Sequence, residues 1–182
     1  VEAIAAKTCK ASVETLDAAG KGSIYELAHA ASPDFVTVPR AGDDLAAILY
    51  TSGTTGRSKG AMLTHTNLAS NALTLAEIWE FTADDVLIHA LPLFHVHGLF
   101  VATNVVLASA ASMIFLPRFD ADDIFRAMPR ATALMGVPTF YHRILGDERF
   151  TRETFAHLRL VTCGSAPLTP ENQASFRERF GV

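Results

Sequence analysis

Short apolar runs alternate along this chain with segments whose apolar residues recur at helical spacing. The apolar runs predict strands at residues 46–50, 85–91, 112–116, 133–137 and 158–162. The helical patterns predict helices at residues 66–79, 97–107, 120–127, 139–145 and 170–180. Such alternation is typical of an α/β fold with a mostly parallel sheet flanked by helices. Ligands of these sheets bind beyond the carboxyl ends of the strands, so the loops after Tyr50, Leu91 and Thr162 are where we expect a site.

Composition excludes several other classes of protein. With 182 residues, 49% of them hydrophobic, the chain can bury a core, and we expect residues 1–182 to form a single α/β piece. A net charge of −4 without a Lys/Arg cluster predicts neither a nucleic acid nor a membrane as partner. The longest apolar stretch, residues 99–116, is interrupted by polar residues and is too short to span a membrane. Cys9 and Cys163 lie far apart and are interpreted as ordinary thiols, which fits a cytoplasmic protein.

The loop after the first predicted strand, which we expect to be buried, combines glycines, hydroxyls and cations. It consists of Thr51, Ser52, Gly53, Thr54, Thr55, Gly56, Arg57, Ser58, Lys59 and Gly60. Glycines let backbone N–H groups approach an anion, hydroxyls donate to phosphate oxygens, and a lysine offsets their charge. The order of residues fits neither a Walker A loop nor a Rossmann fingerprint. A solvated turn is the alternative, but this ordered string after an apolar strand favours a phosphate-binding loop.

Residues 45–60 resemble the signature of the adenylate-forming superfamily, which includes acyl-CoA synthetases, peptide-synthetase adenylation domains and luciferases. The resemblance implies that the chain is part of the large N-terminal domain of such an enzyme. It also implies that the loop grips the β- and γ-phosphates of ATP with Mg²⁺ assisting, and that Thr51 and Lys59 serve catalysis. Family members usually carry proline immediately before the lysine, where this chain has Ser58.

The turn after Leu91 contains two histidines, His95 and His97. A metal site would need carboxylate or thiolate partners that the motif lacks, and a packed or capping histidine is the other structural interpretation. Pro92, His95 and Gly98 match the superfamily's Pro-x-x-His-x-x-Gly turn. This resemblance implies that His95 orients the reacting carboxylate as a hydrogen-bond donor and that His97 supports it. His65 and His89 are interpreted as structural.

The loop after Thr162 lacks the Gly-x-Ser-x-Gly pattern of a nucleophile elbow, and the sequence offers no base for Cys163 as a nucleophile. It resembles the superfamily segment that lies along the acyl-adenylate. The resemblance implies that the boundary between adenine and acyl group is lined by Gly164, Ser165, Ala166 and Pro167.

Arg143 is a candidate residue for recognising the acid substrate. Its spacing favours an ion pair with Asp147 on one helix face, whereas a planar guanidinium can also hold a second carboxylate. Residues 88–104, 112–120 and 135–145 are similar to malonyl-CoA synthetases. That resemblance implies that Arg143 and Ser165 bind the second carboxylate of malonate or methylmalonate. The implied reaction consumes ATP and coenzyme A and gives malonyl-CoA, AMP and pyrophosphate. A medium-chain fatty-acid or aryl-acid CoA ligase, and a nucleotide-binding module without catalysis, are the alternatives.

Relatives in this superfamily continue into an adenine-binding segment, a ribose-binding aspartate and a C-terminal lid domain with the adenylation lysine. None of these is identified in the 182 residues. We therefore expect a fragment of the large domain that is inactive alone as a ligase and self-associates through exposed edges.

Overall fold

The computed structural model describes residues 12–51 and 59–182. The chain divides into two compact units at the boundary between Pro39 and Arg40. In the first unit, helix α2 (Ser23–Ala30) follows a turn in which the Asp17 carboxylate accepts hydrogen bonds from the N–H groups of Ala19 and Lys21, both at 2.8 Å. The sequence patterns predicted no helix in this unit. That the two units form one α/β piece stays a prediction.

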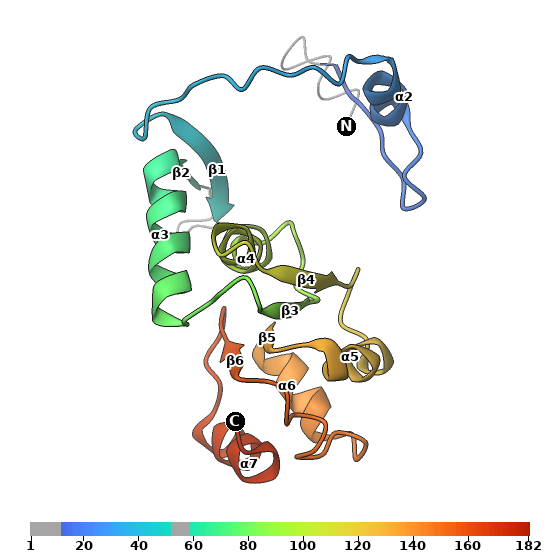
Figure 1. Cartoon of the computed structure of the whole chain (residues 1–182), viewed down its shortest axis with the longest axis vertical. Coiled ribbons are helices and arrows are strands. Elements are labelled where there is room, and N and C mark those ends of the chain that lie inside the picture. The colour runs from blue at the N-terminus through green and yellow to red at the C-terminus, as the bar shows by residue number, and fades with distance from the viewer. Residues whose placement is uncertain (1–11, 52–58) are drawn as a thin grey trace. The chain divides into compact units, whose positions relative to one another are not determined.

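The second unit contains a four-stranded parallel sheet with strand order β4-β3-β5-β6 (Figure 1). Its strands are β3 (Val86–His89), β4 (Ser112–Phe115), β5 (Ala133–Gly136) and β6 (Leu160–Cys163). Helices follow the strands in the predicted alternation: α4 (Thr103–Ala108), α5 (Ala121–Ala127) with the short helix η2 (Met128–Arg130), α6 (Pro138–Leu145) and α7 (Pro170–Phe180). The predicted α/β class is therefore confirmed, and strand ends move by only a few residues.

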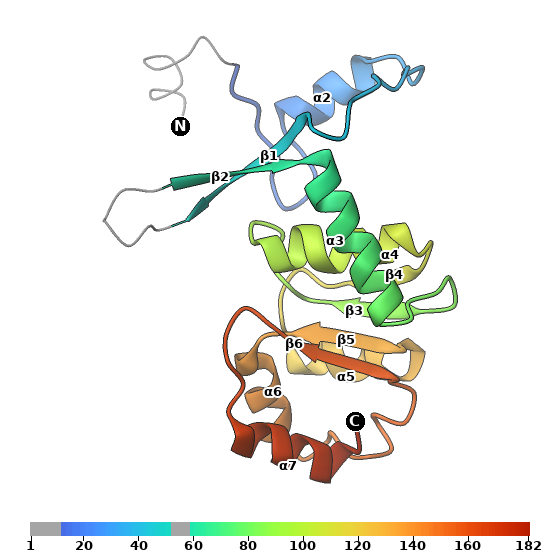
Figure 2. The same ribbon diagram turned by 90° about the vertical axis from the view of Figure 1, so that its left-hand side faces the viewer.

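The sheet separates two hydrophobic cores, one on each face. Successive side chains of β3 and β5 point to opposite faces, so each strand contributes to both cores. Ile88 and Leu134 pack against buried residues of α5, α6 and α7, including Ile124, Tyr141 and Phe176. On the opposite face, Leu87 and Met135 pack against Ala102 and Val105, with partly buried residues of helix α3 (His65–Ile78) beside them. Figure 2 shows the helices on the two sides of the sheet.

The first predicted strand is present, but it does not belong to the parallel sheet. Strand β1 (Leu45–Thr51) pairs antiparallel with β2 (Lys59–Thr64), and the two form a separate two-stranded sheet. β1 is not buried, because the side chains of Ile48 and Tyr50 are 48% and 75% exposed. The loop after Tyr50 therefore connects a hairpin and is not at the carboxyl edge of the parallel sheet. Thr64 then caps α3 through a capping box with Asn67.

The predicted helix 97–107 is divided. A π-helix, η1 (His97–Ala102), precedes α4, and π-helical turns are often found at functional sites. The turn before it is tight, because a Cβ at Gly98 would lie 2.4 Å from the carbonyl oxygen of Pro92. Among the described residues, no helix is long and apolar enough to cross a membrane.

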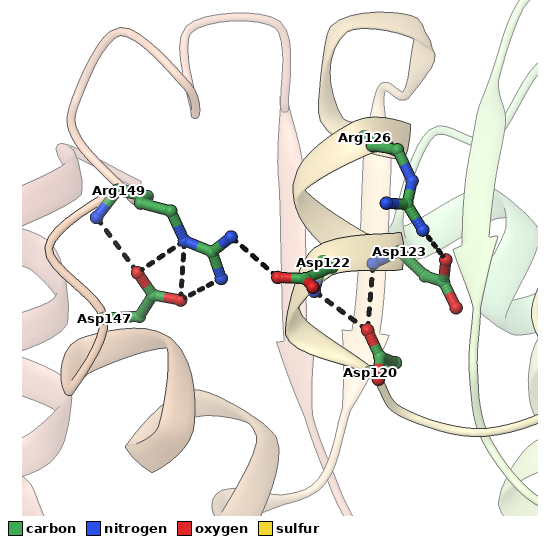
Figure 3. Close-up of polar contacts among 6 residues, drawn as sticks. All are labelled: Asp120, Asp122, Asp123, Arg126, Asp147 and Arg149. Carbon is green, nitrogen blue, oxygen red and sulfur yellow. Dashed lines mark hydrogen bonds and ion pairs between the residues drawn. The ribbon is translucent and has the colours of Figure 1, made fainter.

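Arginines connect elements that are distant in sequence. Arg149, which follows α6, donates to the Asp147 carboxylate at 2.6 Å and to the Asp122 carboxylate of α5 at 2.7 Å (Figure 3). The Asp120 carboxylate caps α5 by accepting from the N–H groups of Asp122 and Asp123. These contacts hold the loop after α6 against the first turn of α5.

Candidate active site

A cavity of about 390 Å³ lies where the loops after Leu91 and Thr162 meet. Its wall is formed by Leu75, Trp79, His95, Val96, His97, Val101, Thr162, Cys163, Gly164 and Ser165. The structure thus brings together four residues that the sequence singled out, namely His95, His97, Gly164 and Ser165. A larger hollow of about 640 Å³ between α6 and α7 contains none of the predicted site residues.

His97 joins the two loops. It is 7% exposed, and its Nδ1 lies 3.1 Å from the Oγ of Ser165. Gly164 lies against the ring, since a Cβ there would be 3.0 Å from His97 Cε1. Burial lowers the pKa of His97, and the nearby His95 and His89 lower it further. The ring is therefore neutral near pH 7. The supporting role predicted for His97 stays a prediction.

His95 is exposed at the mouth of the cavity. Its Nδ1 accepts a hydrogen bond of 3.1 Å from the backbone N–H of His97. In the neutral imidazole the proton is then on Nε2. This tautomer makes Nε2 a donor, as the predicted role of His95 requires.

His89 lies beneath the histidine turn and is fully buried. Its Nε2 is 2.9 Å from the carbonyl oxygen of Gly98, which can only accept, so Nε2 is protonated. The hydroxyl of Thr103 donates to the same carbonyl oxygen at 2.9 Å. Two donors thus fix the start of η1, which agrees with the structural interpretation of His89.

The loop after β6 begins in a strained conformation. Ser165 has a φ of 68°, in the left-handed region that non-glycine residues rarely adopt. The preceding strand end is fixed by Tyr141, which is buried and donates its hydroxyl hydrogen to the carbonyl oxygen of Thr162. Burial raises the pKa of Tyr141, so the phenol stays protonated as this donor requires. Ala166 and Pro167 are exposed and are not among the residues that line the cavity.

Cys163 lines the cavity as a free thiol. Burial raises its pKa, which lowers the thiolate fraction at pH 7. This agrees with the interpretation of Cys163 as an ordinary thiol.

Arg143 is exposed on α6 and does not line this cavity. Its guanidinium carbon lies 5.7 Å from the ring centre of Phe119. The spacing favoured an ion pair between Arg143 and Asp147. In the described part of the chain, the Asp147 carboxylate forms its ion pair with Arg149. The role of Arg143 toward a second carboxylate stays a prediction.

Thr51 and Lys59 are opposite each other, as the cross-strand pair next to the loop that connects β1 and β2. Residues 52–58 lie outside the described part of the chain. The phosphate-binding roles predicted for Ser52, Gly53, Thr54, Thr55, Gly56, Arg57 and Ser58 therefore stay predictions. Among the described residues, no group of three or more His, Cys, Asp and Glu is placed to hold a metal ion, so we assign no residue to Mg²⁺.

The sequence profile of the AMP-binding enzymes matches residues 1–182. The chain belongs to the AMP-binding enzyme family. Among solved structures, ATP-bound MatB from Rhodopseudomonas palustris is 60% identical with a TM-score of 0.95, over 100% of this chain and 36% of that chain. This similarity confirms the predicted relationship to the large domain of adenylate-forming enzymes.

Two curated relatives show the range of acids in this family. The mitochondrial malonate–CoA ligase ACSF3 of Mus musculus is 40% identical over 139 residues, which cover 68% of this chain and 24% of that protein. The indoleacetate–CoA ligase of Aromatoleum aromaticum is 39% identical over 137 residues, which cover 74% of this chain and 27% of that protein. The chain thus spans about a quarter of the length of these relatives.

Proposed function

We propose that the protein that carries this chain is an ATP-dependent, AMP-forming malonate–CoA ligase. The observation that carries the proposal is the cavity in which His95, His97 and Ser165 converge from two loops. A dicarboxylate needs polar groups for both of its ends, and this wall offers imidazole and hydroxyl groups within one small space. The 60% identity to MatB and the relationship to the mouse malonate–CoA ligase support malonate as the acid.

The proposed reaction has two steps. A carboxylate oxygen of the acid attacks the α-phosphorus of ATP, an O–P bond forms, and the bond to the β-phosphate breaks with release of pyrophosphate. The thiol of coenzyme A then attacks the acyl carbon, a C–S bond forms, and AMP leaves. Catalysis of the first step is mainly positioning and charge stabilisation. When bound, Mg²⁺ would offset charge on the phosphates.

This chain would supply three functions to the first step. Residues Thr51–Lys59 hold the β- and γ-phosphates and offset the charge of the departing pyrophosphate. The Nε2–H of His95 donates to the reacting carboxylate and orients it. The hydroxyl of Ser165, oriented by His97, binds the second carboxylate together with Arg143, which has to leave its position over Phe119 to do so. A cytoplasmic location and self-association through exposed edges remain predictions.

An acid panel with the intact protein tests the proposal. We expect pyrophosphate release that depends on malonate, and malonyl-CoA by mass spectrometry when coenzyme A is added. Turnover of indoleacetate or octanoate without turnover of malonate would instead support an aryl-acid or fatty-acid ligase. This is the second candidate because the cavity wall is partly apolar and one relative is an indoleacetate–CoA ligase. ATP binding in a calorimeter without turnover of any acid would support a nucleotide-binding module.

Arg143 gives a sharper test of the dicarboxylate. Replacing Arg143 with alanine removes the proposed partner of the second carboxylate, so kcat/KM for malonate should fall by about 100-fold, as for loss of a charged hydrogen bond. Arg126→Ala is a matched control, because Arg126 is an exposed arginine in an ion pair with Asp123 on α5. Equal and small effects of the two substitutions would contradict the role of Arg143.

A further inference from the structure

The wall of the active-site cavity combines a few polar residues with apolar residues that form most of its surface. His95 and Ser165 come from the two loops and His97 is the first residue of η1, whereas Leu75, Trp79 and Val101 come from α3, its C-cap and the next turn of η1. The proposed function gives roles to the polar residues of this wall but not to the apolar ones. Malonate has a carboxylate at each end. When the carboxylates contact the polar residues, carbon 2 and its substituents are the part of the acid that faces the apolar residues.

Leu75 and Trp79 are four residues apart and therefore lie on one face of the helix. Both are partly buried and pack against the core cluster that contains Phe81, Leu87 and Met135. This packing places the indole between a close-packed core and the cavity. The ring therefore has little room to retreat from a bulky ligand.

The backbone of Trp79 is held as firmly as its side chain. Its N–H donates to the carbonyl oxygen of Leu75 at 2.9 Å, and its own carbonyl oxygen accepts from the Nη1 of Arg159 at 2.9 Å. Arg159 is held in turn by the buried Asp85. These hydrogen bonds hold the backbone of Trp79 in place, and the packing of its side chain against the core limits how far the ring can move.

We propose that Trp79 is a specificity-determining residue that limits the size of the substituent on carbon 2 of the acid. The inference rests on the proposed function, and it names the residue that sets the upper size of the 2-substituent. Leu75 and Val101 complete the same apolar wall. Large 2-substituents are excluded by the indole.

The test compares malonate, methylmalonate, ethylmalonate and benzylmalonate as substrates of the intact protein, by pyrophosphate release. Trp79→Ala should raise the ratio of kcat/KM for benzylmalonate to that for malonate by about tenfold or more, since single methylenes in apolar pockets already discriminate by such factors. Trp79→Phe should give a smaller rise. Leu73→Ala is the matched control, because Leu73 is on the same helix, 60% exposed and outside the cavity wall.

The outcomes separate this proposal from the proposed function. Malonate turnover with the same substrate ratio in Trp79→Ala, Trp79→Phe and wild type would overturn the role of Trp79 and leave the ligase assignment intact. Absence of malonate turnover in the wild type would overturn both. If Trp79→Ala fails to fold, Trp79→Phe and Leu75→Ala decide the question: an increased ratio in these variants supports the apolar wall, and unchanged ratios contradict it.

Discussion

The Nδ1 atom of His97 lies 3.1 Å from the Oγ of Ser165, although the two residues are separated by 68 positions in the sequence. This contact connects the turn after β3 with the loop after β6, which are not adjacent strands, because β5 lies between them. The hydrogen bond therefore spans the carboxyl edge of the sheet. It sets the distance between the proposed acid-orienting residue, His95, and the proposed second-carboxylate residue, Ser165.

A double-mutant cycle measures this contact. Ser165→Gly removes the hydroxyl while tolerating the φ of 68°, and His97→Phe keeps a ring but removes the nitrogen. We expect a coupling free energy of about 1 kcal/mol in the free energy of unfolding, as for a neutral hydrogen bond. Denaturant unfolding of wild type, both single variants and the double variant provides the measurement. Strictly additive effects would show that the two side chains do not interact.

The pH dependence of stability follows from the lowered pKa of His97. The unfolded chain binds a proton at His97 below about pH 6.5, whereas the folded chain resists protonation until a lower pH. The stability that the neutral ring contributes is therefore present above pH 6.5 and is lost as the pH falls through the folded pKa. His97→Phe should weaken this loss, measured by unfolding at pH 5 to 8. Parallel pH profiles for variant and wild type would contradict the assignment.

Local patterns were sufficient for the parallel sheet because each strand is a short apolar run, and the two central strands, β3 and β5, are buried between helices on both faces. Ile88 and Leu134, for example, are completely buried, so continuous hydrophobicity identifies their strands. The same reasoning failed for β1, whose apolar residues are largely exposed and pair with β2. No strand was predicted over β2, which completes the hairpin after the Gly-rich loop.

The site was predicted less completely than the fold. The motif identified His95 and Ser165, but the buried position of His97 depends on the approach of a loop 68 residues away, which local sequence does not encode. Trp79 was read as one apolar position of a helix. Its place in the cavity wall depends on how α3 packs against the sheet face, a tertiary property.

Gly98 is the residue at which the histidine turn should be most sensitive to substitution. In Gly98→Ala the Cβ would lie 2.4 Å from the carbonyl oxygen of Pro92, so the backbone must move. We expect a loss of about 1–3 kcal/mol in unfolding free energy, typical of overpacking, together with reduced acid activation. Gly146→Ala is the control, because its Cβ would make ordinary contacts at 3.6 Å. Equal stability of the two variants would contradict the tight turn.

At the amino end of the sheet, Asp85 accepts hydrogen bonds from Nε of Arg159 at 2.8 Å, from the Thr132 hydroxyl at 2.6 Å and from the Thr82 N–H at 2.8 Å. Burial opposes ionisation of Asp85, but these hydrogen bonds outweigh it and lower its pKa to about 2. Asp85→Asn should therefore cost about 2–3 kcal/mol in unfolding free energy at pH 7. Asp84→Asn, an exposed neighbour, is the control.

The same shift predicts an acid-dependent difference between the two variants. The unfolded carboxylate has a pKa of about 3.9, so the stabilisation by ionised Asp85 is complete above that pH and is lost as the pH falls toward 2. A pKa shift of this size corresponds to a stabilisation of the folded state by at most about 2.6 kcal/mol. The stabilisation is smaller here because the Arg159 side chain is 39% exposed and its charge is partly screened by solvent. Wild type and Asp84→Asn should both lose this stabilisation between pH 4 and 2, whereas Asp85→Asn should not. If Asp85→Asn follows the wild-type profile in acid unfolding, Asp85 is not the titrating group.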